Sequence, residues 1–213
     1  MKYTRALIFT NGTLHDSSLS EISNDDYVIG VDKAAYWLLK HGINPNVAVG
    51  DFDSTSKAEF KRIKKDIADI RTFPPEKDFV DTELAIDIAI NKKITEVILY
   101  GGSGTRLDHT LATLSLLELG IKHNIPILFK TETNEIRLVS RCRTIIKKRG
   151  DLMYFSVIPY TQKIVVSLEG LKYPLTHATI HRGQTIGISN EFLTDSGIIT
   201  VHAGMAFVIQ SKD

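Results

Sequence analysis

The fold is decided by residues 96–129, which read EVILYGGSGTRLDHTLATLSLLELGIKHNIPILF. A short apolar run at 96–100 has the length and composition of a buried strand, and a helical pattern follows at 107–122. A second short apolar run lies at 126–129. A strand, a helix and a strand in this order predict a parallel βαβ unit.

The same alternation extends toward the N-terminus. Residues 56–59, Ser-Lys-Ala-Glu, have the capping-box pattern and predict the start of another helix. Other strands are expected at 5–10, 47–50 and 69–73, and other helices at 33–41 and 80–90. The first part of the chain is therefore expected to form a parallel sheet covered by helices.

The pattern changes after residue 131. No convincing helical pattern follows, and short β-rich runs separated by glycine-containing turns take its place. These runs lie at 135–139, 144–147, 152–157, 163–168, 185–189, 198–201 and 206–210. The sequence thus predicts a parallel-sheet α/β domain at 1–131 and an antiparallel all-β domain, a sandwich or a barrel, at 132–213.

The composition is that of an ordinary globular protein. The chain has 213 residues, 43% of them hydrophobic and 24% charged, and its net charge of +1 favours neither a nucleic-acid nor a membrane partner. Cys142 is the only cysteine, so an intramolecular disulfide and a cysteine zinc cluster are excluded. No apolar stretch approaches the ~20 residues of a membrane span. We expect a cytoplasmic protein.

Two polar clusters follow predicted strands, where ligands bind in open parallel sheets. Asp32 and Lys33 end a strand-like run before a helix, and the alternative is that Asp32 is a helix N-cap. Residues 50–54, Gly-Asp-Phe-Asp-Ser, carry Asp51 and Asp53 at i and i+2, which can point the same way. Hard oxygen ligands of this kind suit Mg²⁺, and the alternative is a solvated acidic turn.

Two further clusters lie later in the same domain. In residues 77–82, Asp81 starts the apolar stripe of a helix and needs a partner, either a metal or Lys77. The alternative is a capping pair favoured by the helix dipole. Residues 101–109, GGSGTRLDH, join a strand to a helix and could place bare N–H groups and Arg106 around phosphate. The alternative there is a structural tight turn. Together the four clusters indicate Mg-nucleotide chemistry.

Five segments in this order resemble motifs of the thiamine pyrophosphokinase family. The resemblance covers nearly the whole chain. The matching segments are Gly-Asp-Phe-Asp-Ser at 50–54, Lys-Asp-x-x-Asp at 77–81, Gly-x-x-Gly-x-Arg-x-Asp-His at 101–109, LEGLKYPL at 168–175 and GISNEF at 187–192. The chain departs from the family at Lys33-Ala34, where glycine often follows the Asp, at Val80, which lacks a common threonine hydroxyl, and at Thr113, which replaces an asparagine.

The resemblance implies a Mg²⁺-dependent transfer of the β,γ-diphosphate of ATP to thiamine, giving thiamine diphosphate and AMP. It implies an ATP-binding catalytic α/β domain and a thiamine-binding β-sandwich, in a homodimer with active sites between subunits. By motif, the metal ligands would be Asp51, Asp53 and Asp81, and the catalytic residues would be these with Asp78 and Arg106. Substrate-binding residues would be Asp32, Lys77, Gly101, Gly102, Gly104, Arg106, Asp108, His109, Ser189 and Asn190.

Two other functions fit parts of the sequence. Residues 51–55 resemble the Asp-x-Asp-x-Thr nucleophile motif of haloacid-dehalogenase-type phosphatases, in which Asp51 would be phosphorylated. That hypothesis leaves the 101–109 loop and the second domain unexplained. A non-catalytic thiamine or nucleotide sensor on the same fold is the third possibility, and the retained acids argue against it.

Overall fold

The computed structural model describes residues 3–73 and 80–213. The chain divides into two compact units, Met1–Glu132 and Thr133–Asp213, so the division falls one residue after the boundary predicted from the sequence. The first unit is α/β and the second is antiparallel β, which confirms the predicted fold class.

The first unit contains six strands that are all paired in parallel. They are β1 (Arg5–Phe9), β2 (Asp26–Val31), β3 (Val47–Gly50), β4 (Ile70–Thr72), β5 (Glu96–Tyr100) and β6 (Ile127–Lys130). Their order in the sheet is β4-β3-β2-β1-β5-β6. The chain therefore winds outward from β1 in one direction and then in the other, and ligands bind at such a switch point in open α/β sheets.

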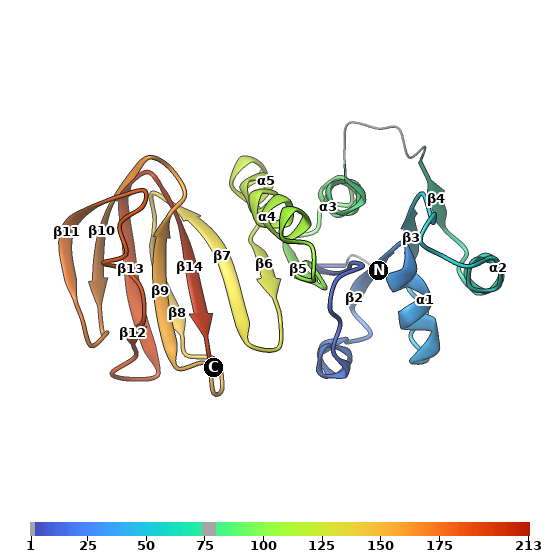
Figure 1. The fold of residues 1–213 in the computed structure, drawn as a ribbon, viewed down its shortest axis with the longest axis horizontal. Helices are drawn as coiled ribbons and strands as arrows, with labels where there is room; N and C mark the ends of the chain where they lie inside the picture. The colour runs from blue at the N-terminus through green and yellow to red at the C-terminus, as the bar shows by residue number, and fades with distance from the viewer. Residues whose placement is uncertain (1–2, 74–79) are drawn as a thin grey trace. The chain divides into compact units, whose positions relative to one another are not determined.

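Helices cover both faces of this sheet (Figure 1). They are η1 (Asp16–Glu21, a 3-10 helix), α1 (Lys33–Lys40), α2 (Lys57–Asp66), α3 (Asp81–Asn91), α4 (Leu107–Ser115) and α5 (Leu117–His123). On one face, Leu38 of α1 joins Leu7, Val28 and Ile98 in a buried cluster, and α3 contacts the strands from the other face. In the described part of the chain no helix is long and apolar enough to cross a membrane.

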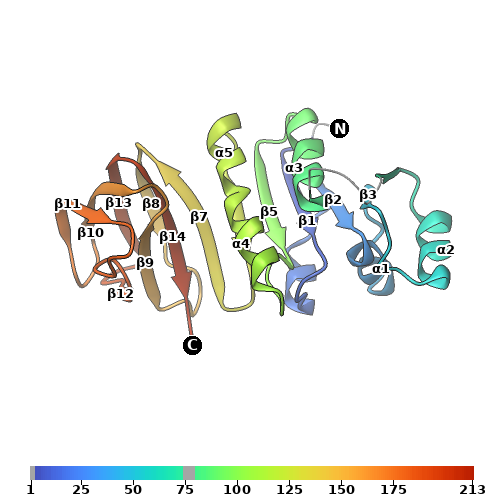
Figure 2. The ribbon, with the colours of Figure 1, turned by 45° about the horizontal axis from the view of Figure 1, so that its top comes forward.

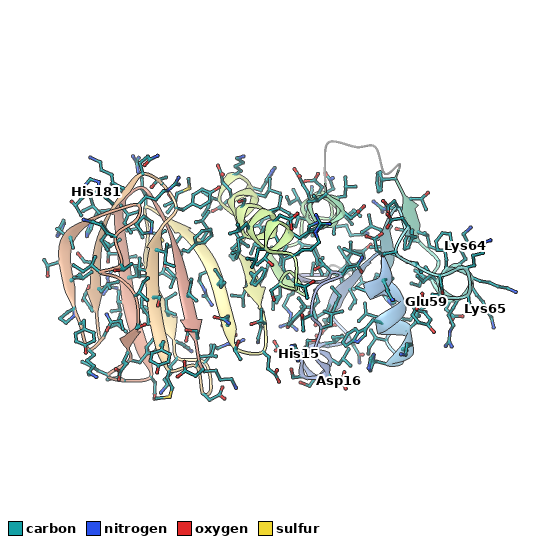
Figure 3. The ribbon with its side chains drawn as sticks, in the orientation of Figure 1. His15, Asp16, Glu59, Lys64, Lys65 and His181 are labelled. Carbon is teal, nitrogen blue, oxygen red and sulfur yellow. The ribbon has the colours of Figure 1, made fainter. Side chains whose placement is uncertain are left out.

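The N-terminus of α2 is fixed as its sequence predicts. The Ser56 side chain accepts a hydrogen bond from the Glu59 amide, and the Glu59 carboxylate accepts one from the Ser56 amide. Glu59 is labelled on this helix in Figure 3, together with Lys64 and Lys65 of its exposed basic side. The capping box is therefore confirmed.

The helix predicted at 107–122 is two helices. The helix is interrupted at Leu116, and Leu117 and Gly120 of the second helix are buried. A side chain at Gly120 would lie 2.6 Å from the Ile125 carbonyl oxygen, so the glycine allows close packing before β6. The apolar periodicity continues through Leu116, which is why the sequence pattern does not reveal the break.

The second unit is a β-sandwich with its own core (Figure 2). Its strands are β7 (Asn134–Ser140), β8 (Arg143–Lys147), β9 (Tyr154–Pro159), β10 (Lys163–Glu169), β11 (Leu175–His181), β12 (Asn190–Glu191), β13 (Ser196–Ala203) and β14 (Met205–Ser211). In this unit the antiparallel strand orders are β12-β9-β14-β7 and β11-β10-β13-β8. The core residues come from both sheets, so the domain is a sandwich and not a barrel.

One predicted strand of this unit is wrong, and two strands were missed, β11 and the two-residue β12. Residues 185–189 form turns, and the Gly187 backbone packs so closely on β9 that a side chain there would lie 2.4 Å from the Val157 carbonyl oxygen. The longer of the missed strands, β11, is an edge strand paired only with β10 among the described strands. Most of its residues are polar and exposed, so it lacks the alternation that marks a half-buried strand.

Candidate active site

Three carboxylates meet at the carboxyl edge of the parallel sheet. Asp32 follows β2, Asp51 follows β3, and Asp81 is the first residue of α3. Each offers a carboxylate oxygen, and these oxygens lie within 4.8 Å of one another. Three hard, anionic oxygen donors at this separation fit a divalent cation such as Mg²⁺.

Asp32 is held in place by the loop after β3. Its carboxylate Oδ1 accepts a hydrogen bond of 3.0 Å from the Phe52 amide, and the residue is only 7% exposed. A Cβ at Gly50 would lie 1.8 Å from this oxygen, so only glycine leaves room for the carboxylate. Asp32 occupies the N-cap position of α1, but its side chain accepts no hydrogen bond from the first turn of the helix. The alternative that the Asp32 side chain caps α1 is therefore wrong.

The electrostatics of Asp32 are those of a buried acid among other acids. The pKa of Asp32 is raised from its ordinary 3.8 to about 7, chiefly by burial and also by the charges of Asp81, Asp51 and Asp53, against the Phe52 amide, which lowers it. Three carboxylates this close repel one another, and a bound cation relieves the repulsion. The burial and the donor set both fit a metal site.

The loop that carries Asp51 is strained and anchored. Phe52 has a φ of 58°, an uncommon value for a bulky residue, and its buried ring stacks on Phe60 at a centroid distance of 4.9 Å. The Asp53 amide donates to Asp51 Oδ1 at 3.0 Å. The Asp53 side chain is exposed and does not belong to the group of three, so its metal role stays a prediction. Lys77 and Asp78 lie outside the described residues.

In the glycine-rich loop after β5, close packing leaves no room for a side chain at the first two glycines. A side chain at Gly101 would lie 2.4 Å from the Thr10 carbonyl oxygen, and one at Gly102 would lie 2.4 Å from the Phe129 ring. Gly104 is exposed, and its nearest such contact is 3.4 Å. The tight-turn interpretation thus accounts for two of the three glycines, and phosphate binding by this loop stays a prediction.

Arg106 and Asp108 lie at the start of α4. They form an ion pair of 2.5 Å with both side chains about two-thirds exposed, at 67% and 64%. His109 is also exposed. Thr113 is buried and donates its hydroxyl to the His109 carbonyl at 2.9 Å, so this departure from the family serves the helix itself. Contacts of these residues with ATP stay predictions.

In the second unit, Asn190 connects two of the family-like segments. Its side-chain oxygen accepts hydrogen bonds from the amides of Tyr173 and Glu191, both at 2.9 Å, and its amide donates to the Tyr173 carbonyl at 2.7 Å. Ser189 adopts a φ of 57° and donates its amide to the Ser156 hydroxyl. The Asn190 side chain is thus largely used in fixing Tyr173, and a direct contact with thiamine stays a prediction.

The sequence alone did not place Asp32 among the possible metal ligands. The family resemblance predicted a substrate contact there. A metal role was not predicted, because the spacing between Asp32 and the acids at 51 and 81 gives no sign that their side chains converge. The position of Asp32 after a predicted strand was the available signal, since the ends of adjacent parallel strands meet at one edge.

An acidic cluster that could hold a metal ion, at the carboxyl edge of a parallel sheet in a chain that also has a β-sandwich, fits the class of two-domain enzymes that act on phosphate groups. Residues 19–129 match the thiamin pyrophosphokinase catalytic domain, and residues 143–206 match the thiamin pyrophosphokinase vitamin B1 binding domain. The chain belongs to the thiamin pyrophosphokinase family.

Individual relatives agree with this assignment. The chain is 37% identical to thiamine pyrophosphokinase of Bacillus subtilis over 87% of each chain. Its fold matches the crystal structure of thiamine pyrophosphokinase from Bacillus subtilis with a TM-score of 0.92, at 34% identity over 98% of this chain and 99% of that one. The thiamin pyrophosphokinase from Geobacillus thermodenitrificans gives a TM-score of 0.88, at 31% identity over 98% of both chains.

Proposed function

We propose that this chain transfers the β,γ-diphosphate of ATP to the hydroxyl of thiamine, giving thiamine diphosphate and AMP, the reaction of thiamine diphosphokinase (EC 2.7.6.2). The observation that carries the proposal is the convergence of Asp32, Asp51 and Asp81 in a chain with both domains of the family. The hydroxyl oxygen attacks the β-phosphorus, and the bond from that phosphorus to the oxygen bridging to the α-phosphorus breaks. AMP leaves with that oxygen.

The acidic cluster would supply the ligands of the metal ion. Asp32, Asp51 and Asp81 would hold Mg²⁺, which would neutralise and align the phosphates of ATP. Asp53 would join them or hold a water of the ion. One of the acids, Asp78 or Asp81, would take the proton that the hydroxyl loses.

Positioning and charge stabilisation account for the rest of the catalysis. Arg106 carries a planar fork of donors that suits phosphate oxygens. Its present partner, Asp108, is exposed, so Arg106 can exchange this carboxylate for a phosphate at small cost. Lys77, His109 and the amides of the 101–104 loop would complete the anion-binding side of the site.

The thiamine end would lie on the β-sandwich, near Ser189 and Tyr173. Tyr173 is 56% exposed although its backbone is fixed by Asn190, and Ile188 beside Ser189 is 44% exposed. An exposed aromatic residue on a fixed backbone, with an apolar neighbour, suits a flat heterocycle. We further propose a cytoplasmic homodimer with sites between subunits, as in the family resemblance. Light scattering should give twice the 23.8 kDa mass of the chain, and a monomer mass would contradict the dimer.

The test is product analysis of the purified protein with MgATP and thiamine. Thiamine diphosphate and AMP should appear in equal amounts, and EDTA should abolish both. Thiamine that binds but stays unchanged would point instead to the sensor. Phosphate released from ATP without AMP would point to the phosphatase chemistry with Asp51 as nucleophile.

A further inference from the structure

Asn11, two residues after β1 in the loop that leads to η1, contacts three parts of the site edge. Its side-chain oxygen accepts a hydrogen bond of 3.0 Å from the Ala34 amide in the first turn of α1. Its amide nitrogen lies 3.4 Å from both Asp32 Oδ2 and Ser54 Oγ, as one donor group shared by two acceptors. No motif of the sequence singles this residue out.

At the start of α1, the side-chain acceptor comes from Asn11 and not from the N-cap residue Asp32. Asp32 occupies the N-cap position and makes no capping bond, while Asn11 supplies an acceptor to the helix from another loop. The Asp32 carboxylate then has a donor on each oxygen, the Phe52 amide on Oδ1 and the Asn11 amide on Oδ2. Donors from two separate loops fix the orientation of the carboxylate.

The residues after Asn11 attach the same loop to the glycine-rich loop. The Gly12 amide donates to the Gly101 carbonyl at 2.8 Å, and the Thr13 amide donates to the Ser103 carbonyl at 2.7 Å. A side chain at Gly12 would lie 2.2 Å from both carbonyl oxygens. Residues 11–13 therefore connect the acidic cluster with the 101–104 loop at the switch point of the sheet.

We propose that Asn11 is a positioning residue for the metal site, orienting the Asp32 carboxylate and holding it against the 51–54 loop. The inference rests on the proposed function, because it takes the acidic cluster as a divalent-cation site. Partners that orient ligands contribute to metal affinity, typically by about 10-fold or more.

The test is Mn²⁺ titration of the nucleotide-free protein, followed by the EPR signal of the free ion. Asn11→Ala should weaken Mn²⁺ binding about 10-fold. The matched control is Asn46→Ala. Asn46 also accepts from a backbone amide, that of Val28, and donates at 3.4 Å to a side-chain oxygen, but it precedes β3 at the opposite edge of the sheet. Both variants should lower Tm similarly, and only Asn11→Ala should weaken Mn²⁺ binding.

A double-mutant cycle separates orientation from general loosening. In the Asp32→Asn background, Asn11→Ala should have little further effect on Mn²⁺ affinity, since it acts through Asp32. Equal affinity of the wild type and Asn11→Ala, additive effects in the cycle, or an equal loss in Asn46→Ala would each overturn the inference and leave the proposed function standing. A wild-type protein that binds no Mn²⁺ would overturn the metal site, and the inference with it.

Discussion

At Gly50 the geometry of one residue determines where another can lie. The backbone there has a φ of 148°, and the space that a side chain would take is filled by the Asp32 carboxylate. Replacement therefore has to move either the loop after β3 or the acid. Because both belong to the candidate metal site, the consequence should be catalytic as well as structural.

Gly50→Ala is expected to lower kcat by 100-fold or more, while costing about 2–3 kcal/mol of stability from the clash and the backbone strain. The control is Gly42→Ala, at a φ of 77° with no atom within 4 Å of the added carbon. It should cost about 1 kcal/mol and leave kcat unchanged. Steady-state rates with thermal denaturation measure both quantities. Normal turnover in Gly50→Ala would refute the claim that a side chain at this position displaces the Asp32 carboxylate or the loop after β3.

Asp32 should make the metal-free protein less stable as the pH rises. Its pKa in the folded protein is about 7, against an ordinary 3.8, so between these values the native state binds more protons than the unfolded state and stability falls with rising pH. Asp32→Asn removes this loss and should be more stable than the wild type at pH 8, by on the order of 2 kcal/mol. The difference should vanish near pH 4.

The same pair of proteins tests the metal. Denaturation at pH 8 with added Mg²⁺ should stabilise the wild type and have a smaller effect on Asp32→Asn, because a ligand of the ion is missing. If the variant is no more stable than the wild type without metal, the burial of an unneutralised charge at Asp32 is not the dominant effect.

At the scale of elements, the loops 170–174 and 189–193 of the sandwich depend on one another. Asn190→Ala leaves the amide and carbonyl of Tyr173 without their partners, so we expect a loss of about 2 kcal/mol and a several-fold rise in the KM for thiamine, with the KM for ATP unchanged. Lys172→Ala removes an exposed ion pair with Glu191 and a 5.6 Å contact of the ammonium with the Tyr173 ring, leaves the backbone of Tyr173 bonded to Asn190, and should cost less than about 1 kcal/mol. A KM for thiamine unaffected by Asn190→Ala would refute the link.

The elements that the sequence revealed are those with strong local patterns. The buried strands of the parallel sheet and the capping box of α2 could be predicted because their apolar runs and cap residues are local. The interruption at Leu116 lies inside a continuous apolar pattern, and edge strand β11 depends on pairing with β10, so no local pattern reveals either. The same holds for the site, since its acids could be named from the sequence while the place of Asp32 among them required the register of β2 and β3.

At the scale of the whole molecule, each unit has its own core. The buried cluster of the sandwich draws all its residues from 139–208, inside the second unit. A fragment of residues 133–213 should therefore unfold cooperatively on heating, as measured by circular dichroism. A fragment of residues 133–204 lacks β14, which lies between β9 and β7, and should not. A gradual transition in the longer fragment would show that its stability depends on the first unit.

The position of β1 in the sheet has a consequence for synthesis. This first strand pairs with β2, at Arg5 to Asp26, and also with β5, at Arg5 to Glu96. One of its edges therefore stays unpaired until β5 has been synthesised. The hydrogen bonds from Gly12 and Thr13 to the glycine-rich loop also cannot form before that loop, which follows β5, has been synthesised. Pairing between distant segments is slow. A ribosome must therefore release β5 before the N-terminal sheet can close, and until then the nascent chain has an open strand edge for chaperones to shield.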